Sequence, residues 1–189
     1  MKKDEILKLF SETGVIQEGH FELSSGKHAD KYLQCARILQ YPDYAEKLAE
    51  SIATFWDEDI DLVVGPAIGG IIVSYAVGKA LNVRSIFSER KNGVMKFRRS
   101  LEVKENEKVL IVEDVVTTGG SVREVVELVE KSGGNIVGIS SLVDRSNGEV
   151  EFKYPFKALV ELKVESYEVD DCELCKKGVE MTKPGSKKI

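Results

Sequence analysis

Residues 109–121 have the sequence VLIVEDVVTTGGS, and this stretch decides the fold. The apolar, β-branched run at 109–112 predicts a buried strand, and two adjacent acids, Glu113 and Asp114, follow it. A turn rich in threonine and glycine occupies 117–121, and a helix is predicted directly after it. Acids that can accept hydrogen bonds from vicinal sugar hydroxyls therefore adjoin a loop that can hold a phosphate. The stretch predicts a site for a ribose 5-phosphate.

The helix is predicted from apolar residues that recur at helical spacing, namely Val122, Val125, Val126 and Val129. Ser121 with Glu124 three residues later predicts a capping box at the start of the helix, and the glycines at 133–134 predict its end. Free N–H groups at such a start favour an anion, because the helix dipole is positive there. The alternative is a plain strand-to-helix junction, since each of these features is common by itself.

Length and composition suit a small soluble enzyme. The 189 residues suit one domain with a sizeable core, and the net charge of −5 does not favour a broad nucleic-acid surface. No apolar run approaches the roughly 20 residues of a membrane span. The first ten residues form an amphipathic helix pattern rather than a signal peptide. Three cysteines are expected to stay reduced, which indicates a cytoplasmic protein.

Alternating helix and strand patterns predict an α/β fold with a mostly parallel central sheet flanked by helices. Helices are expected from about residue 6 to Gly14 and at 44–56, 71–81 and 122–132, and strands at 62–64, 85–88, 108–112 and 136–143. Ligands in such sheets gather at the carboxyl ends of the strands. Three segments are predicted to lie at that edge, each at the end of a strand: GPAIGG at 65–70, EDVVTTGGS at 113–121 and DRSNG at 144–148.

Two further segments could bind a diphosphate. GPAIGG offers small residues and backbone N–H groups after a strand, or it is merely a tight turn; it is no Walker A loop, because Ile71 stands where a lysine is needed. Residues 89–99, ERKNGVMKFRR, carry five basic side chains, and Asn92–Gly93 predicts a hairpin tip or a hinge. A basic loop with a glycine hinge could close over a pyrophosphate. The alternative is a solvated, charged β-hairpin.

The segment EDVVTTGGS resembles the phosphoribosyl-diphosphate (PRPP) signature of the type I phosphoribosyltransferases. Within them the chain is similar to the orotate phosphoribosyltransferases, on FELSSGKHADKYLQC at 21–35, SERKNGVMKFRR at 88–99, LVDRSNG at 142–148 and CELCKKGVEMTKPGSKK at 172–188. The resemblance implies one domain, 1–189, with the type I phosphoribosyltransferase fold. Its core would span about 42–148, and a small hood over the base site would come from about 1–41 and 149–189.

The resemblance implies transfer of ribose 5-phosphate from PRPP to orotate, giving orotidine 5′-monophosphate and pyrophosphate in pyrimidine synthesis. Catalytic roles would fall to Arg90, Lys91 and Asp114, in the basic loop and the acid pair. The residues expected to bind PRPP are Glu113, Asp114, Val115, Val116, Thr117, Thr118, Gly119, Gly120, Ser121, Arg90, Lys91, Lys96, Ile68 and Gly69. The chain departs from many relatives in having Ser24 where they have a lysine, and Lys27 could take over that contact.

The residues expected to bind orotate are Thr117, Arg145, Tyr32, Leu33 and Lys27. A guanidinium fork at Arg145 would bind the carboxylate of orotate through two parallel hydrogen bonds. Tyr32 and Leu33 stand where relatives often have two aromatic residues, although YLQC by itself resembles strand core. A purine base is one alternative, but it has no carboxylate for Arg145. A non-catalytic PRPP sensor is another, but the chain keeps its basic loop and has no appended domain.

The resemblance also implies Mg²⁺ carried on PRPP, with no protein side chain as a direct metal ligand. It implies a homodimer with shared active sites, in which the basic loop reaches the neighbouring subunit. Cys172 and Cys175 form a CxxC pair, but a structural zinc takes four ligands, and only Cys35, His20 and His28 remain to complete a set. We therefore do not expect a complete zinc site within one chain.

Overall fold

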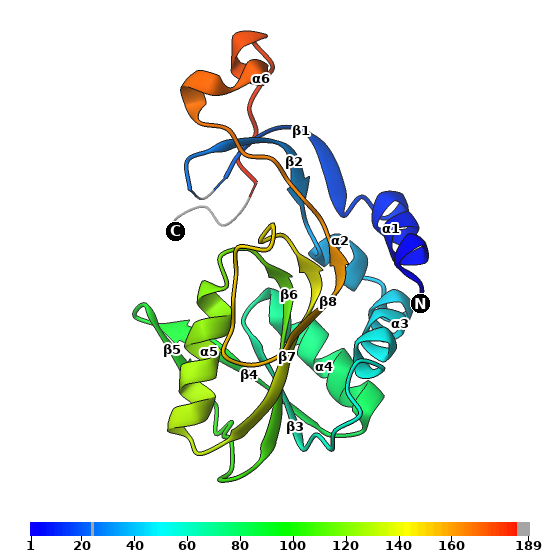
Figure 1. The fold of residues 1–189 in the computed structure, drawn as a ribbon, viewed down its shortest axis with the longest axis vertical. Coiled ribbons are helices and arrows are strands. Elements are labelled where there is room, and N and C mark those ends of the chain that lie inside the picture. The colour runs from blue at the N-terminus through cyan, green and yellow to red at the C-terminus, as the bar shows by residue number, and fades with distance from the viewer. Residues whose placement is uncertain (24, 185–189) are drawn as a thin grey trace.

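The computed structural model describes residues 1–23 and 25–184, and Figure 1 shows a body of sheet and helices below a smaller upper lobe. In chain order the elements are α1 (Lys3–Glu12), β1 (Ile16–Glu22), β2 (His28–Leu33), α2 (Ala36–Leu39), α3 (Pro42–Ala53), β3 (Leu62–Pro66), α4 (Gly69–Leu81), β4 (Arg84–Lys91), β5 (Val94–Phe97), β6 (Lys108–Val116), α5 (Gly120–Lys131), β7 (Asn135–Asp144), β8 (Phe156–Glu161), the 3₁₀ turn η1 (Val169–Asp171) and α6 (Glu173–Lys176).

The body is built on a six-stranded sheet with the order β5-β4-β3-β6-β7-β8. Strand β5 runs antiparallel to β4, and the other neighbouring strands pair in parallel. This arrangement confirms the predicted α/β fold with a mostly parallel sheet. Strand β6 lies in the interior of the sheet between β3 and β7, which explains its nearly continuous apolar sequence.

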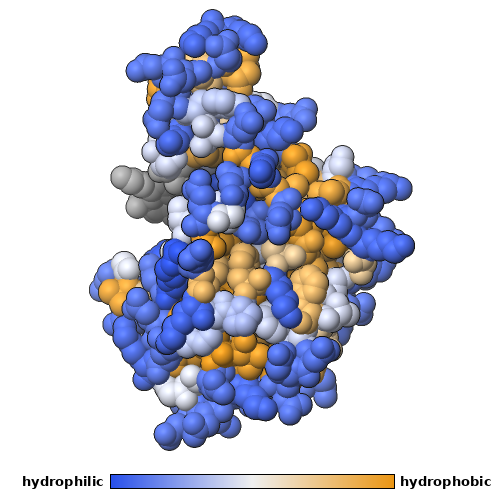
Figure 2. Space-filling view, in the orientation of Figure 1, coloured by the Kyte–Doolittle hydropathy of each residue, from blue (hydrophilic) through white to orange (hydrophobic). Residues whose placement is uncertain are grey.

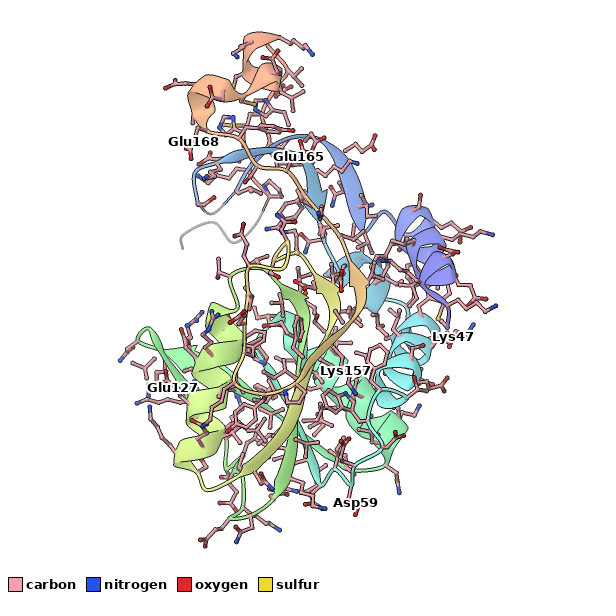
Figure 3. The ribbon with its side chains drawn as sticks, in the orientation of Figure 1. Lys47, Asp59, Glu127, Lys157, Glu165 and Glu168 are labelled. Carbon is pink, nitrogen blue, oxygen red and sulfur yellow. The ribbon has the colours of Figure 1, made fainter. Side chains whose placement is uncertain are left out.

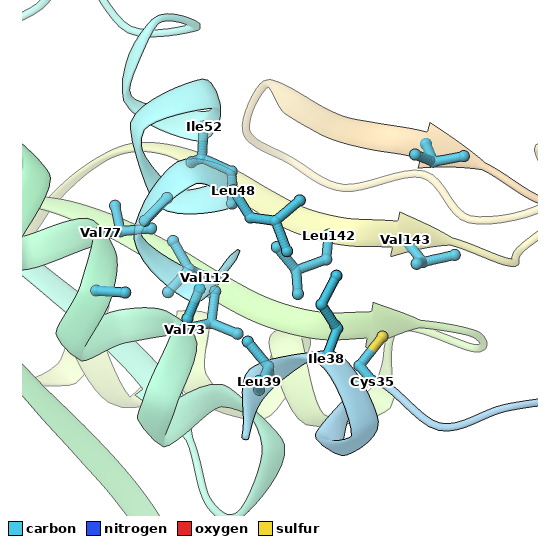
Figure 4. Close-up of a cluster of buried hydrophobic side chains, with 14 of the residues drawn as sticks. Cys35, Ile38, Leu39, Leu48, Ile52, Val73, Val77, Val112, Leu142 and Val143 are labelled. Carbon is cyan, nitrogen blue, oxygen red and sulfur yellow. The ribbon is translucent and has the colours of Figure 1, made fainter. Parts of the chain in front are cut away.

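Helices cover both faces of the sheet, so the molecule has two apolar layers (Figure 1). On one face α3 and α4 pack with α2 against β6 and β7; Figure 4 shows Leu48, Val77, Val112 and Leu142 meeting in this layer. On the other face α5 packs its valines, Val122, Val125 and Val129, against Ile111 and Ile139. The predicted apolar stripe of α5 is therefore confirmed.

Most expected elements are present with their ends shifted by a few residues, and two differences bear on the site. Strand β6 extends to Val116 rather than ending at residue 112, because β7 continues far enough to pair with Val115 and Val116. Strand β8 lies in the stretch 149–189 expected to form the hood, yet it pairs in parallel with β7 and widens the central sheet. Its alternating side chains include Val160, which is buried.

The upper lobe joins the antiparallel β1–β2 hairpin to the C-terminal segment, as Figure 1 shows. Backbone hydrogen bonds link His28 and Tyr167 in both directions, and Thr182 bonds to His20 and Glu22. The face in Figure 2 is mostly hydrophilic, with apolar patches where the lobe meets the body. No helix in the described part of the chain is long and apolar enough to cross a membrane.

Candidate ribose-phosphate site

The acid pair lies near the carboxyl end of β6, inside the strand rather than after it. Glu113 is 9% exposed, and its Oε1 accepts a hydrogen bond of 3.0 Å from the backbone N–H of Asp114. Oδ1 of Asp114 accepts one of 2.9 Å from the N–H of Val115. Both carboxyl groups are thus held by local backbone donors. Cys35 is buried beneath them, with its Sγ 4.0 Å from the carbonyl of Asp114, a neighbour that the sequence did not reveal.

The surroundings of Glu113 change its protonation. Burial, followed by the charge of Asp114 and a hydrogen bond between the two side chains, raises the pKa of Glu113 to about 9. At neutral pH Glu113 is therefore protonated and can donate a hydrogen bond. The sequence analysis had expected two hydrogen-bond acceptors. The site instead pairs one acceptor, Asp114, with one carboxyl group that can also donate.

The Glu113→Gln variant is expected to have a higher Tm than the unchanged protein. The difference in Tm should increase from about pH 5 to about pH 9, where it reaches several degrees. The folded state raises the pKa of Glu113 above its ordinary value of 4.5. In that window the folded protein keeps a proton that the unfolded chain has released, so stability falls as pH rises. Glutamine does not titrate and escapes this loss.

Scanning calorimetry across that pH range measures the effect, with Glu102→Gln, a change at an exposed acid, as the matched control. A gap between the Glu113→Gln variant and the unchanged protein that stays constant with pH would contradict the assigned protonation of Glu113.

The loop after β6 leads directly into α5. The helix begins at Gly120 and its N-cap is Gly119, whose φ of +73° suits glycine; a Cβ there would lie 3.0 Å from the ring of Phe152. Ser121 lies inside the helix and caps nothing, and Glu124 pairs with Arg90 instead, so the predicted capping box is wrong. Because no side chain caps the first turn, its N–H groups stay available for a phosphate.

The other residues of this stretch face different surroundings. Thr118 is exposed and Thr117 is partly exposed, so both hydroxyls can reach a ligand. Val116 is 1% exposed and its carbonyl accepts a hydrogen bond from the N–H of Arg145. The side chain of Val116 therefore belongs to the core, and Val115 is partly buried.

The loop after β3 lies against the acid pair. A Cβ at Gly69 would overlap with the carboxylate of Asp114, so glycine is required at this close approach. The Ala67–Ile68 peptide bond is cis, and the side chain of Ile68 is 86% exposed. The structure thus brings 65–70 and 113–121 together, as their positions after neighbouring strands predicted.

The basic segment forms the β4–β5 hairpin, with its turn at Asn92–Gly93, where both residues have positive φ. Arg90 makes two hydrogen bonds to Glu124 of α5, at 2.7 and 3.2 Å. Arg98 and Arg99 pair with Glu89, whereas Lys91 and Lys96 are exposed. The predicted hairpin tip is confirmed, and among the described residues the three arginines of the hairpin segment form ion pairs whereas Lys91 and Lys96 form none.

Arg145 follows β7 and is tied by its backbone to the end of β6. Partial burial lowers the pKa of this guanidinium. Tyr32 lies on β2 and is partly exposed. Leu33 is 7% exposed and packs in the core. Lys27 forms an ion pair of 2.8 Å with Glu168, which Figure 3 labels within the upper lobe.

Known proteins match this chain over most of its length. A model of the phosphoribosyl transferase domain family matches residues 35–172. An orotate phosphoribosyltransferase of Thermoanaerobacter sp. is 55% identical over 190 residues, covering 100% of both chains. One of Caldicellulosiruptor bescii is 50% identical over 189 residues, also covering 100% of both chains. The chain belongs to the orotate phosphoribosyltransferase family.

A solved structure supports the fold assignment of this orotate phosphoribosyltransferase family member. The enzyme of that name from Mycobacterium tuberculosis H37Rv superimposes with a TM-score of 0.71 at 24% identity, covering 85% of this chain and 96% of the other. Identity this low shows the fold alone. The family places the chain among the enzymes that transfer a pentosyl group.

Four potential metal ligands lie together in the upper lobe, which was not expected from the sequence. His20, His28, Cys172 and Cys175 place one ligand atom each within 4.8 Å of one another. A complete set within one chain was not expected from the sequence, which offered only Cys35, His20 and His28 to join the CxxC pair. The histidines lie 147 to 155 positions from the cysteines that they approach, and the folded lobe brings them together. Ser24 and the part of KPGSKK from 185 onward lie outside the described residues.

Proposed function

We propose that this chain transfers the ribose 5-phosphate of PRPP to orotate, giving orotidine 5′-monophosphate and pyrophosphate. The observation that carries the proposal is the meeting of three groups at one edge of the sheet. The acid pair and the uncapped start of α5 can hold the ribose and its phosphate, and the Arg145 guanidinium lies after the next strand. These groups fit PRPP and a carboxylate-bearing base side by side.

The proposed division of labour follows the positions of the side chains. Asp114 and Glu113 bind the ribose hydroxyls, and the phosphate contacts come from Thr117, Thr118, Gly119, Gly120 and Ser121, with Val115 and Val116 acting through the main chain. Ile68 and Gly69 offer main-chain contacts to the diphosphate. The leaving pyrophosphate is contacted by Arg90, Lys91 and Lys96. To reach it, Arg90 must first break its hydrogen bonds to Glu124.

The base subsite takes Arg145 for the orotate carboxylate and Tyr32 for its ring, with Thr117 touching both substrates. Leu33 supports this subsite from the core, and Lys27 acts there only after leaving Glu168. The attacking nitrogen of orotate is already acidic, so a strong base is not required. The bond from C1′ to the nitrogen forms as the bond from C1′ to pyrophosphate breaks.

Mg²⁺ fits this site as a companion of the substrate. Its preferred ligands are oxygens, and the carboxylate of Asp114 and the hydroxyls of Thr117 and Thr118 supply oxygen atoms beside the proposed phosphate position. We propose that phosphate oxygens and water bind the ion directly. Asp114 and the two threonines would lie near the ion without binding it. The ion would offset the charge of the diphosphate.

A homodimer with shared sites is also part of the proposal. Ile68, Ile72 and Tyr75 are exposed by 86%, 45% and 70%, and they follow one face at the start of α4 beside the site. A second copy that covers these apolar side chains would bring its own basic hairpin close to the acid pair. We place the enzyme in the cytoplasm, where its cysteines would stay reduced.

The release of pyrophosphate from PRPP with different bases tests the substrate. With Mg²⁺ present, orotate is expected to support release, whereas adenine, guanine and hypoxanthine support little, because they offer Arg145 no carboxylate. Release with a purine and none with orotate would leave the fold assignment intact and overturn the proposed substrate.

A further inference from the structure

Four potential metal ligands converge in the upper lobe, away from the ribose-phosphate site. His20 lies in β1 and His28 in β2, whereas Cys172 is the N-cap of α6 and Cys175 lies within that helix. We propose that these four side chains bind one Zn²⁺ ion, which fastens the C-terminal segment to the β1–β2 hairpin. The inference stands independently of the substrate proposed above.

Four of the six separations between the ligand atoms are close to the edges of a zinc tetrahedron. Nε2 of His20 lies 3.0 Å from Nδ1 of His28, 3.5 Å from Sγ of Cys172 and 3.6 Å from Sγ of Cys175. Nδ1 of His28 lies 3.1 Å from Sγ of Cys175. Ordinary zinc bond lengths give edges of about 3.4 Å between two nitrogens and about 3.6 Å between nitrogen and sulfur. The four separations differ from these edges by about half an ångström or less. The other two, from Cys172 to His28 and from Cys172 to Cys175, are no longer than 4.8 Å.

The tautomer of His20 is set for metal binding. Its Nδ1 lies 2.8 Å from the carbonyl oxygen of Val179. Since a carbonyl can only accept, Nδ1 must carry the proton, which leaves the lone pair of Nε2 free. Nε2 is the atom that faces His28 and both sulfurs. A backbone carbonyl that accepts a hydrogen bond from the non-binding nitrogen, and so fixes the ring, is common at zinc sites.

Burial and charge also suit a bound ion. His20, His28 and Cys172 are 4%, 5% and 0% exposed, whereas Cys175 is exposed and gives an ion a way in. Two thiolates with Zn²⁺ sum to no net charge, which lowers the cost of burying the group. Two sulfur and two imidazole ligands in a tetrahedron select zinc among the common metals.

The site would be structural rather than catalytic, because four protein ligands leave no open position. It lies between two backbone bridges, one from His28 to Tyr167 and one from His20 to Thr182. The ion would complete this connection between segments far apart in the sequence. Tyr32, proposed to contact the base, lies on the same strand as His28, so the ion would also steady that side of the base subsite.

Metal analysis of untagged, full-length protein purified under reducing conditions tests the proposal. We expect about one zinc per chain. The Cys175→Ser variant, changed at an exposed position, is expected to lose nearly all of it, and Cys172→Ser likewise. The Cys35→Ser variant, changed at the cysteine outside the cluster, is expected to keep its zinc. Equal zinc in the unchanged protein and in folded Cys175→Ser would overturn the proposal.

Cobalt substitution gives a second readout that needs only the unchanged protein. Protein produced with Co²⁺ in zinc-poor medium is expected to show the strong visible bands and the thiolate charge-transfer band of a tetrahedral site with sulfur ligands. A weak octahedral spectrum would overturn the proposal, as would a Cys172–Cys175 disulfide in freshly purified protein. A strong chelator should lower the Tm, and zinc but not Mg²⁺ should restore it.

Discussion

Replacing Lys91 with alanine is expected to lower kcat by about 100- to 1,000-fold, with a much smaller rise in the KM for PRPP. Lys91 ends β4 at the tip of the basic hairpin and is exposed, so its charge is free to meet an anion. Negative charge builds on the departing pyrophosphate in the transition state more than in bound PRPP. A cation that acts on this charge therefore changes kcat more than substrate binding.

Steady-state kinetics with varied PRPP measure the effect, and Lys104→Ala, a change at an exposed lysine outside the hairpin, is the matched control. An unchanged kcat in Lys91→Ala would remove the hairpin from the catalytic account. Mixing Lys91→Ala with Asp114→Asn protein then tests the shared site. If the hairpin acts in the neighbouring subunit, mixed dimers contain one intact site, and activity is partly restored.

Replacing Arg145 with alanine is expected to lower kcat/KM for orotate by about 100-fold or more, because it leaves the buried carboxylate of the substrate unpaired. The KM for PRPP should change little, since Arg145 follows β7 whereas the acid pair and the phosphate loop belong to β6 and α5. Arg145→Lys keeps the charge but loses the fork, so an intermediate loss is expected.

Uracil, which lacks the carboxylate of orotate, makes this test specific. In the unchanged protein orotate should bind far better than uracil, and in Arg145→Ala the preference should largely disappear. Isothermal titration in the presence of pyrophosphate and Mg²⁺ measures both affinities. A preference for orotate that survives in the variant would assign the carboxylate contact to another residue.

The periodicity of side chains predicted most of the fold, because buried strands and amphipathic helices leave strong local patterns. The apolar run at 109–112 and the valine stripe of α5 lie where they were expected. The end of β6 was missed because pairing with β7, a contact between distant segments, extends the strand to Val116. The capping box failed because Gly119 starts the helix earlier, and local sequence alone did not distinguish the two starts.

The site was predictable where one short stretch supplies it and unpredictable where folding assembles it. The acid pair and the phosphate loop are contiguous, so their position after a strand was enough to place them. The raised pKa of Glu113 depends on burial between the sheet and the start of α4, and the zinc ligands come from both ends of the chain. The CxxC pair is visible in the sequence, but neither its approach to the two histidines nor the burial of Glu113 leaves a local pattern.

The fall in the ultraviolet absorbance of orotate, followed with purified protein, PRPP and Mg²⁺, tests the central claim most directly. We expect a loss of absorbance that requires the protein, PRPP and Mg²⁺ together, and that nearly stops in Arg145→Ala. If orotate persists although the protein is folded and binds PRPP, the proposed reaction is contradicted, because the ribose-phosphate site would then serve a different acceptor.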